Sequence, residues 1–172
     1  NKVIPGIVDE YSGSASFKWL ERAINILLEG KANALVTAPI SKIAWHKAGH
    51  KFAGQTELLG KLTNKKTSML FTAISPNNGW RFNTLLATTH IPLNKINDTL
   101  TKPLIKHKLD TLLNFCRKFK EKPSIQIAGL NPHAGEEGKI GIEEQNLIIP
   151  ILNEWKSDCL LYTSDAADET CR

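Results

Sequence analysis

Two histidines occupy positions where a protein built on a sheet could use an imidazole. His90 and His133 each follow an apolar run that is typical of a strand, and each lies beside a proline-containing loop. Because functional groups gather at the strand ends of a wound sheet, these two side chains can meet although they are distant in sequence. Two neutral imidazoles and a third ligand would suit zinc or another divalent ion. Two unrelated loop histidines would give the same pattern, so both interpretations stay open.

Two other segments contain residues that could bind or react. Residues 37–42 (Thr-Ala-Pro-Ile-Ser-Lys) combine hydroxyls, an ammonium and a helix start, which together suit an anionic ligand. They lack the glycine-rich run of a P-loop, and a turn with a capping serine explains them equally well. The glutamate pairs at 136–137 and 143–144 could supply a base. They could as simply be a solvated loop and the first turn of a helix.

The first part of the chain predicts helices around a short strand. Apolar residues at helical spacing from Ser14 predict a helix that ends at Gly30. Residues 34–37 are a strand candidate, and residues 41–48 predict a short helix capped by Ser41. Residues 52–59 have the pattern of a glycine turn followed by a polar triplet and an apolar pair.

The second part predicts a hairpin, two helices and a buried strand. Strands at 67–74 and 81–89 are joined by an Asn-Asn-Gly turn, so the sheet is expected to be mixed. A long helix is expected at 102–120 with Cys116 as a core thiol on its apolar stripe. A buried strand follows at 124–128, and a final helix from Glu143 is expected to bend at Pro150. The order of these elements indicates an α/β fold.

Composition restricts the class of protein. The chain has 172 residues, 41% of them hydrophobic, which fits one soluble domain or a piece of a larger one. No apolar run approaches the roughly 20 residues that span a bilayer, and the N-terminus has no signal-peptide pattern. Three scattered cysteines fit a reducing compartment, so we expect a cytoplasmic protein that does not bind membranes.

The net charge of +5 is spread along the chain. Its densest cluster, residues 117–122, lies at the end of a predicted helix, where cations suit the helix dipole. No aromatic-interleaved basic patch accompanies it, so we expect no nucleic acid partner. A basic balance would also suit a small phosphorylated substrate.

The C-terminal residues differ from the rest. Residues 159–169 resemble an in-frame translation of a transposase adapter used in preparing sequencing libraries. We therefore treat 159–172 as a non-native tail from adapter read-through and 1–158 as the genuine part. An ordinary acidic tail is the alternative.

Four segments, in this order, resemble the 4-hydroxythreonine-4-phosphate dehydrogenase family, the NAD-dependent enzymes of pyridoxal phosphate biosynthesis. They are residues 37–42, 54–57, 88–93 and 129–136, the last followed by Glu143 and Glu144. The last segment, Gly-Leu-Asn-Pro-His-Ala-Gly-Glu, is the most specific of the four. The resemblance covers about residues 1–156 and implies a central fragment that lacks both ends of a family member.

The resemblance implies a fold similar to isocitrate and isopropylmalate dehydrogenases, with two α/β lobes and a cleft at a homodimer interface. The family oxidises a hydroxyl of the phosphorylated substrate with NAD or NADP, and loss of carbon dioxide gives 3-amino-2-oxopropyl phosphate. It holds a divalent metal, which could be zinc, magnesium or cobalt, through three histidines. His90 and His133 match two of them. The third belongs to a His-Asp-Gln segment outside this chain, so we expect the fragment itself to be inactive.

Gln55 and Thr56 match the family's substrate-contacting His-Thr pair, and Gln55 is a departure from it. A glutamine can hydrogen-bond a substrate but cannot become cationic or move a proton near neutral pH. Its role is therefore hydrogen bonding alone, or the substrate differs. The alternatives are a related dehydrogenase of another phosphorylated hydroxy acid, a metal-dependent hydrolase or lyase, and a non-catalytic binding module. Neither a catalytic group nor a nicotinamide-binding residue is identified.

Overall fold

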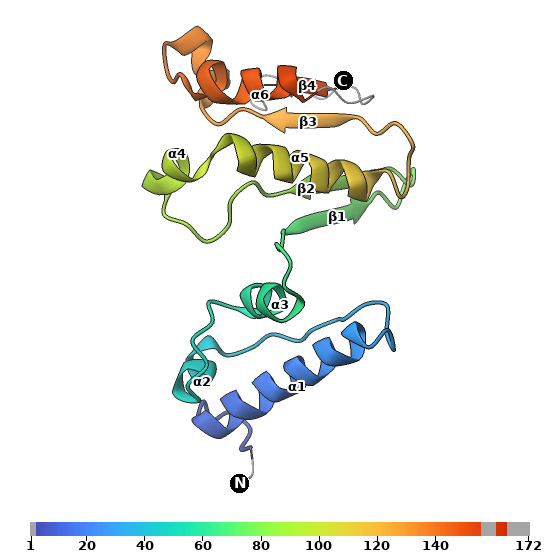
Figure 1. The fold of residues 1–172 in the computed structure, drawn as a ribbon, viewed down its shortest axis with the longest axis vertical. Helices are drawn as coiled ribbons and strands as arrows, with labels where there is room; N and C mark the ends of the chain where they lie inside the picture. The colour runs from blue at the N-terminus through green and yellow to red at the C-terminus, as the bar shows by residue number, and fades with distance from the viewer. Residues whose placement is uncertain (1–2, 156–160, 165–172) are drawn as a thin grey trace. The chain divides into compact units, whose positions relative to one another are not determined.

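The computed structural model describes residues 3–155 and 161–164, which belong to two compact units (Figure 1). Unit 1 is Asn1–Thr67 and unit 2 is Ser68–Arg172, a division that the sequence analysis did not predict. The chain contains both helices and strands, which confirms a mixed α/β protein. No helix within the described residues has both the length and the apolar character needed to cross a bilayer.

Unit 1 is built from three helices, α1 (Glu10–Leu28), α2 (Lys42–Lys47) and α3 (Gln55–Thr63). α1 begins earlier than predicted because Asp9 caps it: its carboxylate accepts from the Ser12 N–H at 2.8 Å, and the Ser12 hydroxyl accepts from the Asp9 N–H at 3.2 Å. α2 confirms the predicted short helix, with the Ser41 hydroxyl accepting from the Ala44 N–H at 3.2 Å. The buried core consists of Phe17, Leu20, Ile24, Trp45 and Leu58.

Two predictions for unit 1 were wrong. Residues 34–37 form no strand, because a strand needs a partner and the described part of this unit offers none. The side chain of Val36 is 96% exposed there. Conversely, α3 was missed: Gly54 gives it no side-chain cap, and Leu58 is its one fully buried residue. The short apolar face left a pattern too weak to predict a helix.

Unit 2 begins with the predicted hairpin. β1 (Leu70–Ile74) pairs antiparallel with β2 (Arg81–Leu85), with Leu70 opposite Leu85 and Ile74 opposite Arg81. The turn is closed by the Ser75 N–H, which donates to the Trp80 carbonyl at 2.8 Å. Both strands are shorter than the sequence predicted.

The rest of unit 2 alternates helices and strands. After a 3₁₀ turn at Leu93–Lys95 come α4 (Ile96–Thr99), α5 (Lys102–Cys116), β3 (Ile125–Ala128), a second 3₁₀ segment at Pro132–Gly138, a π turn at Glu144–Ile148, α6 (Ile149–Glu154) and β4 (Leu161–Ser164). Pro150 lies in the first turn of α6, where the π turn gives way to α-helix, and the bend expected there stays a prediction. α5 ends four residues before the predicted Lys120.

The described strands of unit 2 form two sheets, which corrects the expectation of one wound sheet. β1 and β2 make one pair, and β3 pairs in parallel with β4 in the other. α5 packs beside β2, and its Leu109 lies in the core that Ile148 and Leu152 form with Ile127 of β3. Within the described residues, no backbone hydrogen bonds pair one sheet with the other. The two sheets are therefore connected through side chains that pack on α5. β4 lies in the segment set apart as a tail, where no strand was predicted.

Cys116 is half-buried and not the core thiol that the apolar stripe predicted. Its sulfur accepts from the Asn83 side-chain amide of β2 at 3.9 Å. The position is about one turn beyond the buried Leu113, at the last residue of α5.

Candidate functional site

The loop after β3 carries His133 on a left-handed backbone. His133 (φ 50°, ψ 35°), Ala134, Gly135, Glu136 and Glu137 all have positive φ, so the turn from Pro132 to Gly138 winds with the opposite hand to an ordinary helix. The Ala134 N–H donates to the Asn131 carbonyl at 3.1 Å, which starts the turn. The left-handed conformation costs roughly 1–2 kcal/mol for each residue with a Cβ, and four of the five carry one.

His90 shares this unusual conformation, with φ at 56°. In the described part of the chain, Asn64 is the one non-glycine residue with positive φ outside the loops that carry His90 and His133. Strained backbone of this kind tends to occur at functional sites, where the surrounding structure holds it in place. The backbone thus singles out the same two loops as the side-chain chemistry.

A buried carboxylate holds the His133 loop. Glu144 is 3% exposed, and its Oε1 accepts from the backbone N–H groups of Leu130 and Asn131, each at 2.7 Å. Its Oε2 accepts from the Asn131 side-chain amide at 2.8 Å. The predicted helix start at residues 143–144 is confirmed, because Glu144 opens the π turn that leads into α6. The burial of its carboxylate against the backbone of Leu130 and Asn131 was not predicted.

Burial and hydrogen bonds shift the pKa of Glu144 in opposite directions. Burial by itself raises the pKa of this carboxyl, because a charge is costly away from water. The hydrogen bonds from the Asn131 side chain and from the backbone of Asn131 and Leu130 outweigh that effect, and the pKa lies below its usual value. Around it is a cavity of about 60 Å³ with mostly apolar walls, including Ile127, Ala134 and Ile148.

Glu143 connects the two histidine-bearing segments. Its Oε2 accepts at 2.7 Å from the side-chain amide of Asn131, which lies two residues before His133 in the sequence. Its Oε1 accepts at 2.8 Å from the side-chain amide of Asn97, in α4 just beyond the His90 loop. The bond from Asn131 is the main cause that lowers the pKa of Glu143. A chain of hydrogen bonds therefore runs from α4 through Glu143 and Asn131 to Glu144.

The imidazoles of His90 and His133 are both on exposed residues. No group of three or more His, Cys, Asp or Glu side chains suited to a metal ion occurs among the described residues. The predicted ligands thus lie on linked loops of one unit, and a third protein ligand is not found beside them there.

Gln55 and Thr56 open α3 in unit 1 and are half-buried. The Gln55 side-chain amide donates to the carbonyl of Ala38 at 2.9 Å. This bond joins the 54–57 segment to the 37–42 segment, which the sequence analysis treated as separate candidates. The Lys42 side chain also approaches Gly54, the N-cap of α3, so an ammonium and a helix start lie close together.

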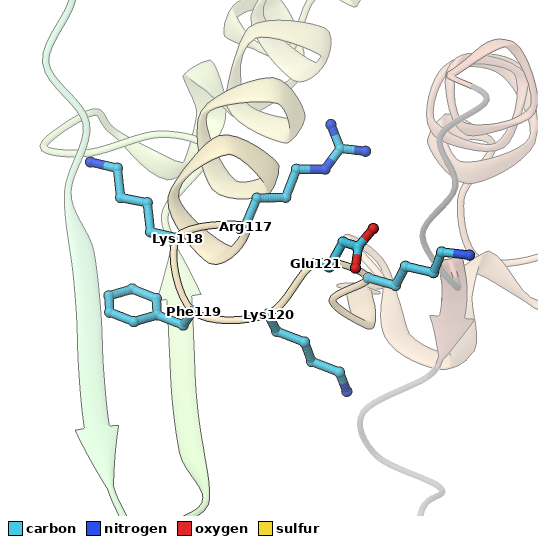
Figure 2. Close-up of a pocket in the computed structure, with 6 residues that line it drawn as sticks. Arg117, Lys118, Phe119, Lys120 and Glu121 are labelled. Carbon is cyan, nitrogen blue, oxygen red and sulfur yellow. The ribbon is translucent and has the colours of Figure 1, made fainter.

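A hollow of about 520 Å³ lies elsewhere in unit 2, lined by residues 117–122 of the loop that follows α5. Figure 2 shows Arg117, Lys118 and Lys120 pointing in different directions from this loop. Ligand pockets usually gather a few converging polar groups from several elements. This hollow is lined by one loop, the basic cluster noted in the sequence, and by none of the residues predicted to bind metal or substrate, so we do not assign it as the site.

Known proteins match nearly the whole chain. A family model described as pyridoxal phosphate biosynthetic protein PdxA matches residues 1–170. The chain belongs to this family. It is 52% identical over 155 residues to 4-hydroxythreonine-4-phosphate dehydrogenase of Synechococcus sp. (strain RCC307), an alignment that covers 90% of this chain and 47% of that relative. It is 34% identical over 160 residues to D-threonate 4-phosphate dehydrogenase of Pectobacterium atrosepticum, covering 89% of this chain and 46% of the relative.

A solved PdxA-family structure has the same fold over the shared region. The chain superposes on 4-hydroxythreonine-4-phosphate dehydrogenase from Klebsiella pneumoniae with a TM-score of 0.76 and 35% identity, covering 88% of this chain and 45% of that one. The chain thus spans about half the length of the curated relatives it matches. The family match also extends into residues 159–170, and the adapter origin of that segment stays a prediction.

Proposed function

We propose that this chain is the central part of an NAD(P)-dependent, divalent-metal-dependent dehydrogenase. Its substrate would be 4-hydroxythreonine 4-phosphate, oxidised and decarboxylated to 3-amino-2-oxopropyl phosphate in pyridoxal phosphate biosynthesis. Membership of the PdxA family and the names of its relatives support this proposal. We also propose that the complete enzyme has a fold similar to isocitrate and isopropylmalate dehydrogenases. The relatives named above are dehydrogenases, so a metal-dependent hydrolase or lyase is not favoured.

His90 and His133 are proposed as two of the metal ligands. The observation that supports this most strongly is their shared left-handed backbone on loops linked through Glu143. Two exposed imidazoles are suitable donors for zinc or cobalt and leave positions for substrate, and the remaining protein ligand must come from outside the described residues. When bound, the metal would act as a Lewis acid on the substrate's oxygens.

Gln55 and Thr56 are proposed to orient the substrate by hydrogen bonds. One amide N–H of Gln55 donates to Ala38, so its second N–H, its amide oxygen and the Thr56 hydroxyl are the groups that could meet a ligand. Neither side chain moves a proton near neutral pH, so proton transfer must use other groups. Lys42 lies close to the start of α3 and would attract a phosphorylated substrate, while the nearby Glu57 carboxylate would weaken that attraction.

We also propose that the enzyme works in the cytoplasm as a homodimer. Aromatic side chains on the β1–β2 hairpin support an interface: Phe71 is 57% exposed, Trp80 62% and Phe82 51%. Contiguous exposed apolar groups of this kind often mark contacts with other protein surfaces.

The test is an assay of the complete enzyme, with NAD or NADP, a divalent metal and each candidate substrate, following the absorbance of reduced cofactor. We expect reduction with 4-hydroxythreonine 4-phosphate. Reduction with D-threonate 4-phosphate alone would assign the chain to the other dehydrogenase named among its relatives. No reduction with either would overturn the proposal.

The histidine variants test the metal site within this assay. His90→Ala and His133→Ala should each lower kcat/KM by at least about 100-fold. Each removes a proposed ligand of the metal that would stabilise the charge developing on the substrate. His107→Ala is the matched control, a histidine of α5 whose backbone carbonyl, and not its ring, accepts from Thr111. It should keep nearly full activity.

A further inference from the structure

Glu144 is the one charged side chain that is buried among the described residues. A buried carboxylate is costly unless it is fully hydrogen-bonded, and Glu144 accepts three hydrogen bonds of 2.7–2.8 Å. All three come from Leu130 and Asn131, the residues that lead into the His133 loop. The proposed reaction gives Glu144 no role, so its burial and its partners call for another explanation.

Glu144 also shapes the far side of the same loop. Gly135, at the centre of the left-handed turn, has φ of 83° and lies so close to the carbonyl of Gly141 that a Cβ would collide with it. The same Cβ would lie 3.1 Å from Oε2 of Glu144. Gly141 in turn lies against the Asn131 side-chain amide, with no room for a Cβ. The carboxylate, the amide and the two glycines thus pack tightly together within the segment that carries His133.

Strain and support occur together in this loop. The left-handed path of His133, Ala134, Glu136 and Glu137 is unfavourable for L residues, so it persists only if other contacts stabilise it. The hydrogen bonds of Glu144 are strong because the acceptor is charged and shielded from water. They fix the backbone at 130 and 131, immediately before the turn, which determines where the imidazole of His133 projects.

We infer that Glu144 is a positioning residue for His133, holding the left-handed loop so that the imidazole is presented to the metal. This inference rests on the proposed function, in which His133 is a ligand. Partners that orient a metal ligand typically change metal affinity by 10–100-fold when they are removed. Glu144 acts through the backbone of the loop, so we expect a loss near the lower end of that range.

The experiment measures Zn²⁺ affinity of the complete enzyme by competition with a chromophoric chelator. Glu144→Gln keeps the size of the side chain, but its amide nitrogen would face the Asn131 amide, so that two donors meet and no hydrogen bond forms. This variant should weaken Zn²⁺ binding about tenfold. Asn131→Ala, which leaves the two backbone bonds of Glu144 in place, should weaken it less and serves as the milder variant if Glu144→Gln folds poorly. Glu137→Gln is the matched control, because it removes an exposed charge from the same loop and should leave the affinity unchanged.

A second readout separates positioning from a purely structural role. Zn²⁺ raises the free energy of unfolding by an amount set by its affinity for the folded state. A tenfold loss of affinity lowers that increment by about 1.4 kcal/mol at saturating Zn²⁺. If Glu144 were merely structural, Glu144→Gln would destabilise the metal-free and the Zn²⁺-saturated enzyme equally.

The outcomes distinguish the two proposals. Wild-type Zn²⁺ affinity in His133→Ala would overturn the metal site and the positioning role together. A loss in His133→Ala, with wild-type affinity in both Glu144→Gln and Asn131→Ala, would overturn the positioning role alone. A loss in His133→Ala and a smaller loss in Glu144→Gln, with Glu137→Gln unchanged, would support both.

Discussion

The loops that carry His90 and His133 share a left-handed backbone but differ in how the protein holds them. The His133 loop lies on a buried carboxylate with hydrogen bonds of 2.7–2.8 Å. The His90 loop is solvated, with His90 exposed and the nearby Leu93 86% exposed. Its connection to the other loop runs through the exposed bond from Asn97 to Glu143.

This difference suggests unequal contributions to a shared site. A ligand on a supported loop is oriented before the metal arrives, so little ordering entropy is lost when it binds. A ligand on a solvated loop loses more freedom on binding. We therefore expect His133 to define the geometry of the site and His90 to adjust to it. The following predictions test that contrast.

The largest expected effect is on stability. Glu144→Ala should lower the free energy of unfolding of unit 2 by about 3 kcal/mol, because it leaves the half-buried backbone donors of Leu130 and Asn131 without acceptors. Leu93→Ala, in the exposed segment, should change it by less than about 0.5 kcal/mol. Urea unfolding followed by tryptophan fluorescence would measure both, since Trp155 packs on the core of this unit. If both substitutions lowered the free energy of unfolding equally, the His133 loop would be no better supported than the His90 loop.

The second prediction concerns acid. Hydrogen bonds lower the pKa of Glu144 in the folded protein, so the folded state binds its proton less readily than the unfolded chain does. The stability contributed by Glu144 is therefore fully present above its unfolded pKa of about 4.3 and is lost as the pH falls through the folded pKa. Urea midpoints measured from pH 7 down to pH 3 should fall more steeply in the wild type than in Glu144→Gln.

Some acid sensitivity should remain in that variant. The pKa of Glu154 is also lowered, chiefly by hydrogen bonds from Lys102 and Lys106, and so is the pKa of Glu143. Parallel pH profiles for the wild type and Glu144→Gln would show instead that Glu144 contributes nothing to acid unfolding.

The third prediction measures the strain directly. At Glu137, with φ of 56°, the glycine variant should be more stable than the alanine variant by about 1 kcal/mol, because glycine adopts positive φ without a steric penalty. Both variants remove the same charge, so their difference isolates the backbone. At Glu21, inside α1, the order should reverse by about 1 kcal/mol. Greater stability of Glu137→Ala would mean that the turn is not strained.

The sequence predicted the elements whose signals are local. Helical spacing of apolar residues identified α1 and α5, and the Asn-Asn-Gly turn identified the β1–β2 hairpin. The apolar spacing is strong because each of these helices buries one face. The expected strand at 34–37 failed because strand formation depends on a partner that local sequence does not specify.

The histidines of the candidate site could be predicted from the sequence, but the contacts that hold their loops could not. The two histidines were identified from their positions after apolar runs. The role of Glu144 was missed because an acidic residue before an apolar run usually marks a helix start in water. Its burial depends on donors 13 and 14 residues away in sequence. The left-handed turn was missed for a similar reason: Gly135 hints at it, but the other four residues carry no local preference for it.

The smallest expected effect concerns the connection between the two loops. Asn97→Ala removes one exposed hydrogen bond to Glu143 and should lower the free energy of unfolding by only about 0.5 kcal/mol. If that bond also restrains the His90 loop, Zn²⁺ affinity of the complete enzyme should fall slightly in Asn97→Ala, by less than in Glu144→Gln. Asn94→Ala, in the exposed 3₁₀ turn between His90 and α4, is the control and should leave Zn²⁺ affinity unchanged. A fall in Asn97→Ala as large as in Glu144→Gln would show that the two loops contribute equally to Zn²⁺ binding, and a larger fall would mean that the His90 loop defines the site.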